Sequence, residues 1–167
     1  MKILYICIMY GTLEIQMDKY LCQFMRRTLR EVDGAVELDK SDWFGSLLYN
    51  CMEHVPEDCW YVKRDFVKKD VLRVRFGQLR RGETGRTGAP KSWDYDYYIP
   101  HSKQVFIEKY VRDWMENVLC SFIDLNLKLT GMEIKDLIDI FCQHYNIDFG
   151  TYYETFKKKY YRYRKPK

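Results

Sequence analysis

The amino-acid sequence predicts a mainly α-helical protein, α+β only in a small sense, with about five helices and one β-hairpin. Two patterns support this class. Apolar residues recur at intervals of three and four over most of the chain, and one segment alternates with a period of two. The composition, 47% hydrophobic and 17% aromatic among 167 residues, is sufficient for a packed core. No apolar run reaches the roughly 20 residues that cross a bilayer, so no membrane-spanning helix is expected.

The apolar spacing of the N-terminal segment predicts one helix. Residues 3–10 are apolar and fit either a short strand or a leader, in which case Met17 is an alternative native start. Helical spacing runs from residue 13 to residue 32, and Asp33-Gly34 ends this helix. Its inward positions are expected to be Met17, Tyr20, Leu21, Phe24, Met25, Leu29 and Val32.

A second helix is predicted to begin near Ser41 and to end before Pro56, because the residue that precedes a proline is disfavoured in a helix. Residues 57–67 allow a further helical segment but do not require one. The inward side chains of the second helix are expected to be Trp43, Phe44, Leu47, Leu48 and Cys51.

A β-hairpin is predicted at about residues 71–99. Apolar and charged residues alternate over residues 72–76 and again over residues 93–97, which is the pattern of two half-buried strands. In this pairing Arg73 and Arg75 would lie opposite Asp94 and Asp96, and such pairs of opposite charge stabilise a sheet. The strands are joined by a long, glycine-rich, basic loop that carries Arg80, Arg81 and Arg86.

The longest helix is predicted at residues 102–129, with Ser102 as its N-cap. Apolar residues recur at three and four over its whole length, so we expect it to be the central helix of the core. Its inward side chains are expected to be Val105, Phe106, Tyr110, Val111, Trp114, Val118, Leu119, Phe122, Ile123 and Leu129.

Two further helices, residues 132–145 and 151–163, form a C-terminal pair with the outline of a helix-turn-helix. Each is expected to begin with a capping box, at residues 130–133 and 151–154, in which a Thr and a Glu bond each other's free backbone N–H groups. The core-facing residues of the last helix are expected to be Phe156 and Tyr160.

Positive charge is concentrated at the C-terminus. The net charge is +4, but seven of the 28 Lys and Arg residues lie in residues 157–167, where no acid occurs. The other 21 basic residues are outnumbered by 24 acidic ones, which leaves the rest of the chain at −3. We therefore distinguish a helical domain, residues 1–129 with the hairpin inserted, from a basic two-helix element, residues 130–167, packed on it. Such asymmetry is typical of a segment that binds a polyanion, although a solvated tail has the same pattern.

A basic helix with interleaved tyrosines can neutralise phosphates and offer aromatic faces for stacking. The sequence therefore favours a small non-enzymatic nucleic-acid-binding or regulatory protein that contacts DNA phosphates through its last helix, with the hairpin loop as a second contact. The predicted contact residues are Lys157, Lys158, Lys159, Arg162, Arg164, Lys165, Arg80, Arg81 and Arg86. The alternative is a protein-interaction module, such as an inhibitor or assembly factor, whose partner-binding residues are Tyr153, Tyr161 and Tyr163.

The C-terminal pair of helices also resembles a known family. Residues 132–137 (Met-Glu-Ile-Lys-Asp-Leu), Phe141 and residues 145–156, which run from Tyr-Asn-Ile-Asp-Phe-Gly to Glu-Thr-Phe, are similar to the C-terminal region of RteC-type regulators. These regulators come from conjugative transposons of Bacteroidetes, and the similarity covers about 30 of the 167 residues. The resemblance implies a DNA-binding or regulatory role in a mobile element or phage, with residues 157–164 as the contact surface.

The remaining motifs predict neither a cofactor nor an active site. The glycines of the hairpin loop are not followed by Gly-Lys-Ser/Thr, so they do not form a phosphate-binding loop. Cys51-x-x-His54, Cys59 and Cys142-x-His144 do not have the spacing of paired zinc ligands, and we expect no metal. The six cysteines are scattered, as in proteins whose thiols are buried and reduced, which predicts a cytoplasmic protein.

Overall fold

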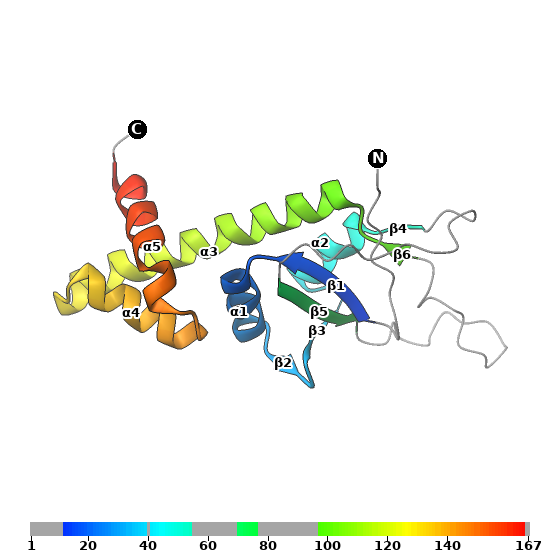
Figure 1. Cartoon of the computed structure of the whole chain (residues 1–167), viewed down its shortest axis with the longest axis horizontal. Helices are drawn as coiled ribbons and strands as arrows, with labels where there is room; N and C mark the ends of the chain where they lie inside the picture. Colours follow the sequence, from blue (N-terminus) through cyan, green and yellow to red (C-terminus); the bar gives the residue numbers. More distant parts are fainter. Residues whose placement is uncertain (1–11, 40, 55–69, 77–96, 166–167) are drawn as a thin grey trace.

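The computed structural model describes residues 12–39, 41–54, 70–76 and 97–165. Within them the protein is mainly helical, as predicted, with a small mixed sheet (Figure 1). The helices are α1 (Lys19–Thr28), α2 (Trp43–Cys51), α3 (His101–Thr130), α4 (Ile134–Tyr145) and α5 (Phe149–Arg164). The strands are β1 (Thr12–Met17), β2 (Glu31–Val32), β3 (Ala35–Leu38), β4 (Glu53–His54), β5 (Asp70–Phe76) and β6 (Tyr97–Tyr98). No helix in these ranges has the length and apolarity required to span a membrane.

Four strands form the main sheet in the order β1-β5-β3-β2, with β5 antiparallel to β1 and parallel to β3. One face is apolar and buried, because side chains alternate along each strand. The other face carries cross-strand ion pairs, Arg73–Glu14 at 3.3 Å and Arg75–Glu37 at 3.4 Å. The sheet therefore has the alternating burial that was predicted for residues 72–76. Asp94 and Asp96, the acids predicted to lie opposite its arginines, are outside the described residues.

The pairing predicted for the β-hairpin is wrong in its described part. Both edges of β5 are occupied, one by β1 and the other by β3. Tyr97, the end of the predicted second strand, pairs instead with His54 in the small sheet of β4 and β6. Residues 77–96, with Arg80, Arg81 and Arg86, lie outside the described residues.

The first predicted helix, residues 13–32, is also corrected. Its first part is β1, in which Leu13, Ile15 and Met17 alternate with polar residues and are fully buried. Helix α1 is accordingly shorter, and Asp33-Gly34 forms the turn between β2 and β3, with φ angles of 50° and 75°. Two consecutive residues with positive φ are what a tight hairpin turn of the Asp-Gly type requires. β1 therefore supplies core residues that precede Met17, whereas residues 1–11 lie outside the described part of the chain.

Helix α3 is the central helix, as predicted, and it contacts α1, α4, α5 and β1. In Figure 1 it links the end of the molecule that holds the main sheet to the end that holds α4 and α5. Its fully buried row advances in steps of four and consists of Ile107, Val111, Met115, Leu119 and Ile123. Four of the side chains that were expected to face inward lie beside this row and are exposed, namely Val105, Phe106, Tyr110 and Leu129. The helix follows Pro100, and Ser102 does not cap it.

The two predicted capping boxes are wrong, although both helices exist. Thr130 is the last residue of α3, which ends at Gly131 with a φ of 67°, and Glu133 flanks α4 without a side-chain cap. Asp148 caps α5 by accepting a hydrogen bond from the backbone N–H of Thr151 at 3.1 Å. One hydrophobic core extends across the predicted boundary at residue 129, from β1 to the buried side chains of Phe156 and Tyr160.

Candidate nucleic-acid interface

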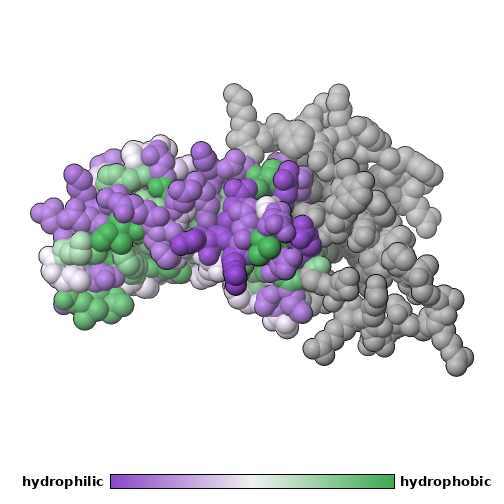
Figure 2. Space-filling view, turned by 90° about the horizontal axis from the view of Figure 1, so that it is seen from below, coloured by the Kyte–Doolittle hydropathy of each residue, from purple (hydrophilic) through white to green (hydrophobic). Residues whose placement is uncertain are grey.

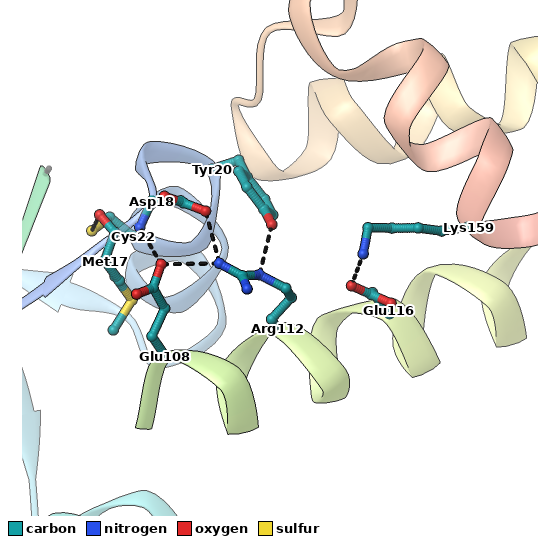
Figure 3. Close-up of polar contacts among 8 residues, drawn as sticks. All are labelled: Met17, Asp18, Tyr20, Cys22, Glu108, Arg112, Glu116 and Lys159. Atoms are coloured by element: carbon teal, nitrogen blue, oxygen red, sulfur yellow. Dashed lines mark hydrogen bonds and ion pairs between the residues drawn. The ribbon is translucent and has the colours of Figure 1, made fainter. Parts of the chain in front are cut away.

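Helix α5 is attached to the rest of the protein along one face. The fully buried Phe156 lies at ring-centroid distances of 5.8 Å from Tyr20 on α1 and 6.4 Å from Phe141 on α4. One turn later the Tyr160 hydroxyl donates a hydrogen bond of 2.6 Å to Asp124 on α3. Lys159 forms an ion pair with Glu116 on α3 (Figure 3). These contacts fix which side of α5 faces outward.

The opposite face of α5 is basic. Lys158, Arg162 and Lys165 follow one another at spacings of four and three, and residues this far apart lie on one side of a helix. All residues from 161 to 165 are exposed, so no side of the last turn is covered. Figure 1 shows this end of α5 extending past α3. The helix therefore presents its cations on a projecting end.

The predicted contact residues of α5 differ in how they are paired. Lys159 is bound to Glu116, so this predicted contact residue faces α3 and is corrected to an anchor of the helix. Lys157 lies 3.9 Å from Glu154 and 5.3 Å from the centre of the Tyr153 ring, and these neighbours raise its pKa above the ordinary value. Arg164 lies over the Tyr160 ring at 5.9 Å. Among the predicted contact residues of α5, Lys158, Arg162 and Lys165 form neither an ion pair nor a cation–π contact with any described residue.

The three tyrosines predicted to bind a partner do not share a surface. Tyr153 is half-buried and packs on Phe149, with ring centroids 4.9 Å apart. Tyr161 and Tyr163 are exposed, but two residues along a helix correspond to a rotation of about 200°, so they point to opposite sides. A single partner surface made of all three is therefore not what the fold provides.

The structure instead gathers exposed aromatic rings between α2 and α3. Trp43, Phe106 and Tyr110 are 43%, 52% and 44% exposed. Ring centroids are 6.0 Å apart for Trp43 and Tyr110, and 6.4 Å apart for Phe106 and Tyr110. All three side chains were expected to face the core. For Phe106 and Tyr110 the sequence did contain a signal. Each precedes by one residue a member of the buried row that begins at Ile107 and Val111, so both lie beside that row on the helix.

The described surface is hydrophilic over much of the face seen in Figure 2, with hydrophobic residues at the end formed by α4 and the end of α3. The exposed apolar side chains on α4 and on the C-terminal end of α3 are Leu125, Leu129 and Ile140. They are separated from the aromatic rings of Trp43 and Phe106 by the polar middle of α3, where Asp113 and Asn117 are exposed.

A polar cluster joins α1 to α3 (Figure 3). Arg112 donates hydrogen bonds to Asp18 at 2.8 Å, to Glu108 at 3.0 Å and to the Tyr20 hydroxyl at 3.2 Å. Burial raises the pKa of Tyr20, which therefore stays neutral at physiological pH. Because the guanidinium is matched by two carboxylates, the cluster is suited to holding the two helices together.

The described cysteines are poor nucleophiles. Burial raises the pKa of Cys22 and Cys142 to about 12 and that of Cys120 to about 11, so their thiols are protonated at neutral pH. In the described part of the chain no group of three His, Cys, Asp or Glu side chains is arranged to hold a metal ion. Cys59, one of the residues considered as a zinc ligand, lies outside this part.

Comparison of the chain with models of protein families, with curated proteins and with solved structures gives no match. The resemblance of the C-terminal helices to RteC-type regulators therefore stays a prediction. The observation from which a function can be inferred is the geometry of α5.

Proposed function

We propose that this protein binds nucleic acid, and DNA in particular, through the projecting end of α5, as a small regulatory protein of a mobile element or phage without enzymatic activity. The observation that supports this proposal is the row of Lys158, Arg162 and Lys165, which are exposed and unpaired within the described residues. Exposed cations without a carboxylate partner are available to replace the counterions of a phosphate backbone.

The connection between α4 and α5 is compatible with a helix-turn-helix, in which the first helix helps to position the second on DNA. Three residues, 146–148, connect the helices, and Asn146 has a φ of 56°. This length is typical of a helix-turn-helix connection. However, recognition helices read base edges from their first turns, whereas the cations of α5 lie in its second half. Contacts to phosphates carry no sequence information, so we expect binding without a strong sequence preference.

The experiment is fluorescence anisotropy with a labelled mixed-sequence DNA duplex at low salt. The triple variant Lys158→Ala, Arg162→Ala and Lys165→Ala should lose at least tenfold in affinity, because three phosphate contacts disappear. Its matched control removes the same charge from exposed lysines of α3 and α4, as Lys109→Ala, Lys128→Ala and Lys135→Ala. The control should bind within about threefold of wild type. Equal losses in both variants, or no binding by the folded wild type, would contradict the proposal.

A second candidate function is that of a protein-interaction module, and the exposed rings of Trp43, Phe106 and Tyr110 are the observation that favours it. Amphipathic aromatic side chains dominate the energetics of protein interfaces. Binding of this kind would be weakened by Trp43→Ala and Phe106→Ala and would depend little on salt. Binding to DNA should show the reverse behaviour, so the two candidates are distinguishable with the same variants.

A further inference from the structure

Tyr161 lies on the outward half of α5, beside the row of Lys158, Arg162 and Lys165. Its neighbours one helical turn before it are Lys157 and Lys158, and those one turn after it are Arg164 and Lys165. Tyr161 therefore stands within a frame of four cations. Its side chain is 48% exposed, and its ring contacts that of the buried Tyr160 at a centroid distance of 6.2 Å.

This arrangement combines two features that one ligand can use together. The cations attract phosphates, and the two outermost unpaired ones, Lys158 and Lys165, lie about 10 Å apart along the helix axis. The ring between them offers a face on which a nucleobase can stack. In a duplex the base faces are covered by their neighbours, whereas in a single strand they are free to stack on aromatic side chains.

Resting on the proposed function, we infer that α5 prefers single-stranded nucleic acid, with one base stacked on Tyr161 and the flanking phosphates bound by Lys158 and Lys165. Duplex DNA of the same length uses the cations but not the ring. The site thus differs from a simple basic patch in its dependence on one aromatic side chain.

Tyr163 provides the matched control for this inference. It is as exposed as Tyr161, at 54%, and belongs to the same turn. Its neighbours one turn earlier are Lys159, which is bound to Glu116, and the fully buried Tyr160. Tyr163 therefore has the same chemistry and exposure without the cationic frame on that side.

The test compares binding of a labelled 12-nucleotide single strand, the same strand with abasic sites, and a 12-base-pair duplex, all at one salt concentration. The wild type should bind the single strand most tightly. Tyr161→Ala should weaken single-strand binding about tenfold, the size of one base–aromatic stack, and change duplex and abasic binding by less than twofold. Tyr161→Phe and Tyr163→Ala should bind the single strand within about twofold of wild type.

The outcomes separate this inference from the proposed function. If the wild type binds DNA but Tyr161→Ala weakens single strand and duplex equally, or no more than Tyr163→Ala does, the stacking site is wrong and the basic interface stands. If the folded wild type binds neither form of DNA at low salt, both are wrong. Circular dichroism of each variant checks the fold, which these exposed substitutions should leave unchanged.

Discussion

The contact that holds α5 on α3 gives the most specific stability prediction. Tyr160 is fully buried, and its hydroxyl donates a hydrogen bond of 2.6 Å to Asp124. This length is typical of a bond to an ionised carboxylate, which stabilises a protein by about 1.5–3 kcal/mol. Asp124 is only half-buried, so water can replace the lost donor. We therefore expect Tyr160→Phe to reduce the free energy of unfolding by about 1.5 kcal/mol, the smaller end of this range.

Urea denaturation of wild type, Tyr160→Phe, Asp124→Ala and the double variant forms a cycle that isolates this hydrogen bond. The coupling energy should be about 1.5 kcal/mol, and the melting temperature of Tyr160→Phe should fall by roughly 3–6 °C. Tyr163→Phe, which alters an exposed tyrosine of the same helix, should change stability by less than about 0.5 kcal/mol. A coupling energy near zero would refute this role of Tyr160.

The same hydroxyl predicts a pH dependence. Burial and the hydrogen bond to Asp124 raise the pKa of Tyr160 from 10.0 to about 12. Folded Tyr160 therefore keeps its proton after the unfolded chain has lost it. The stabilisation is complete below pH 10 and is lost as the pH rises towards 12. The difference in stability between wild type and Tyr160→Phe should shrink over this range, and a constant difference would contradict the assignment.

Three further predictions concern the core. Gly45→Ala should destabilise the protein by about 3 kcal/mol, because the new Cβ would overlap the backbone carbonyl oxygen of Asp39. Gly150→Ala, whose new Cβ would have its nearest atom at 3.8 Å, should be neutral or stabilising in the same melts. A chain that begins at Met17 lacks most of β1, with the buried Leu13 and Ile15, and should not give a cooperative thermal transition, whereas the full chain should. With Cys7 and Cys59 replaced by Ser, the native protein should react slowly with a thiol reagent and rapidly in denaturant, because the four remaining cysteines are buried, namely Cys22, Cys51, Cys120 and Cys142.

The long helices could be predicted from the sequence because their apolar periodicity extends over many turns. The N-terminal segment could not, since Leu13, Met17 and Tyr20 satisfy helical spacing while Leu13, Ile15 and Met17 satisfy the alternation of a strand. The segment forms a strand and not a helix because it pairs with β5, which lies more than fifty residues away in the chain. Local pattern carries no information about such a partner.

The candidate interface shows the same limit. The concentration of cations in α5 is visible in the sequence, as is the inward direction of Phe156 and Tyr160. The sequence does not show which of these cations remain available to a ligand, because the partner of Lys159 is Glu116, which lies 43 residues earlier in the chain. The position of Tyr161 among four cations follows from the three- and four-residue spacing of the helix, and its outward direction follows once the buried side of α5 is known.

The salt dependence of DNA binding tests the central claim most directly. The logarithm of the association constant should fall with the logarithm of the salt concentration with a slope of about −3, one for each of Lys158, Arg162 and Lys165. Each single replacement of these residues by Ala should reduce the slope by about one, and Lys135→Ala should leave it unchanged. A slope that is the same in all four variants, or near zero in the wild type, would contradict the account of α5 as a phosphate-binding helix.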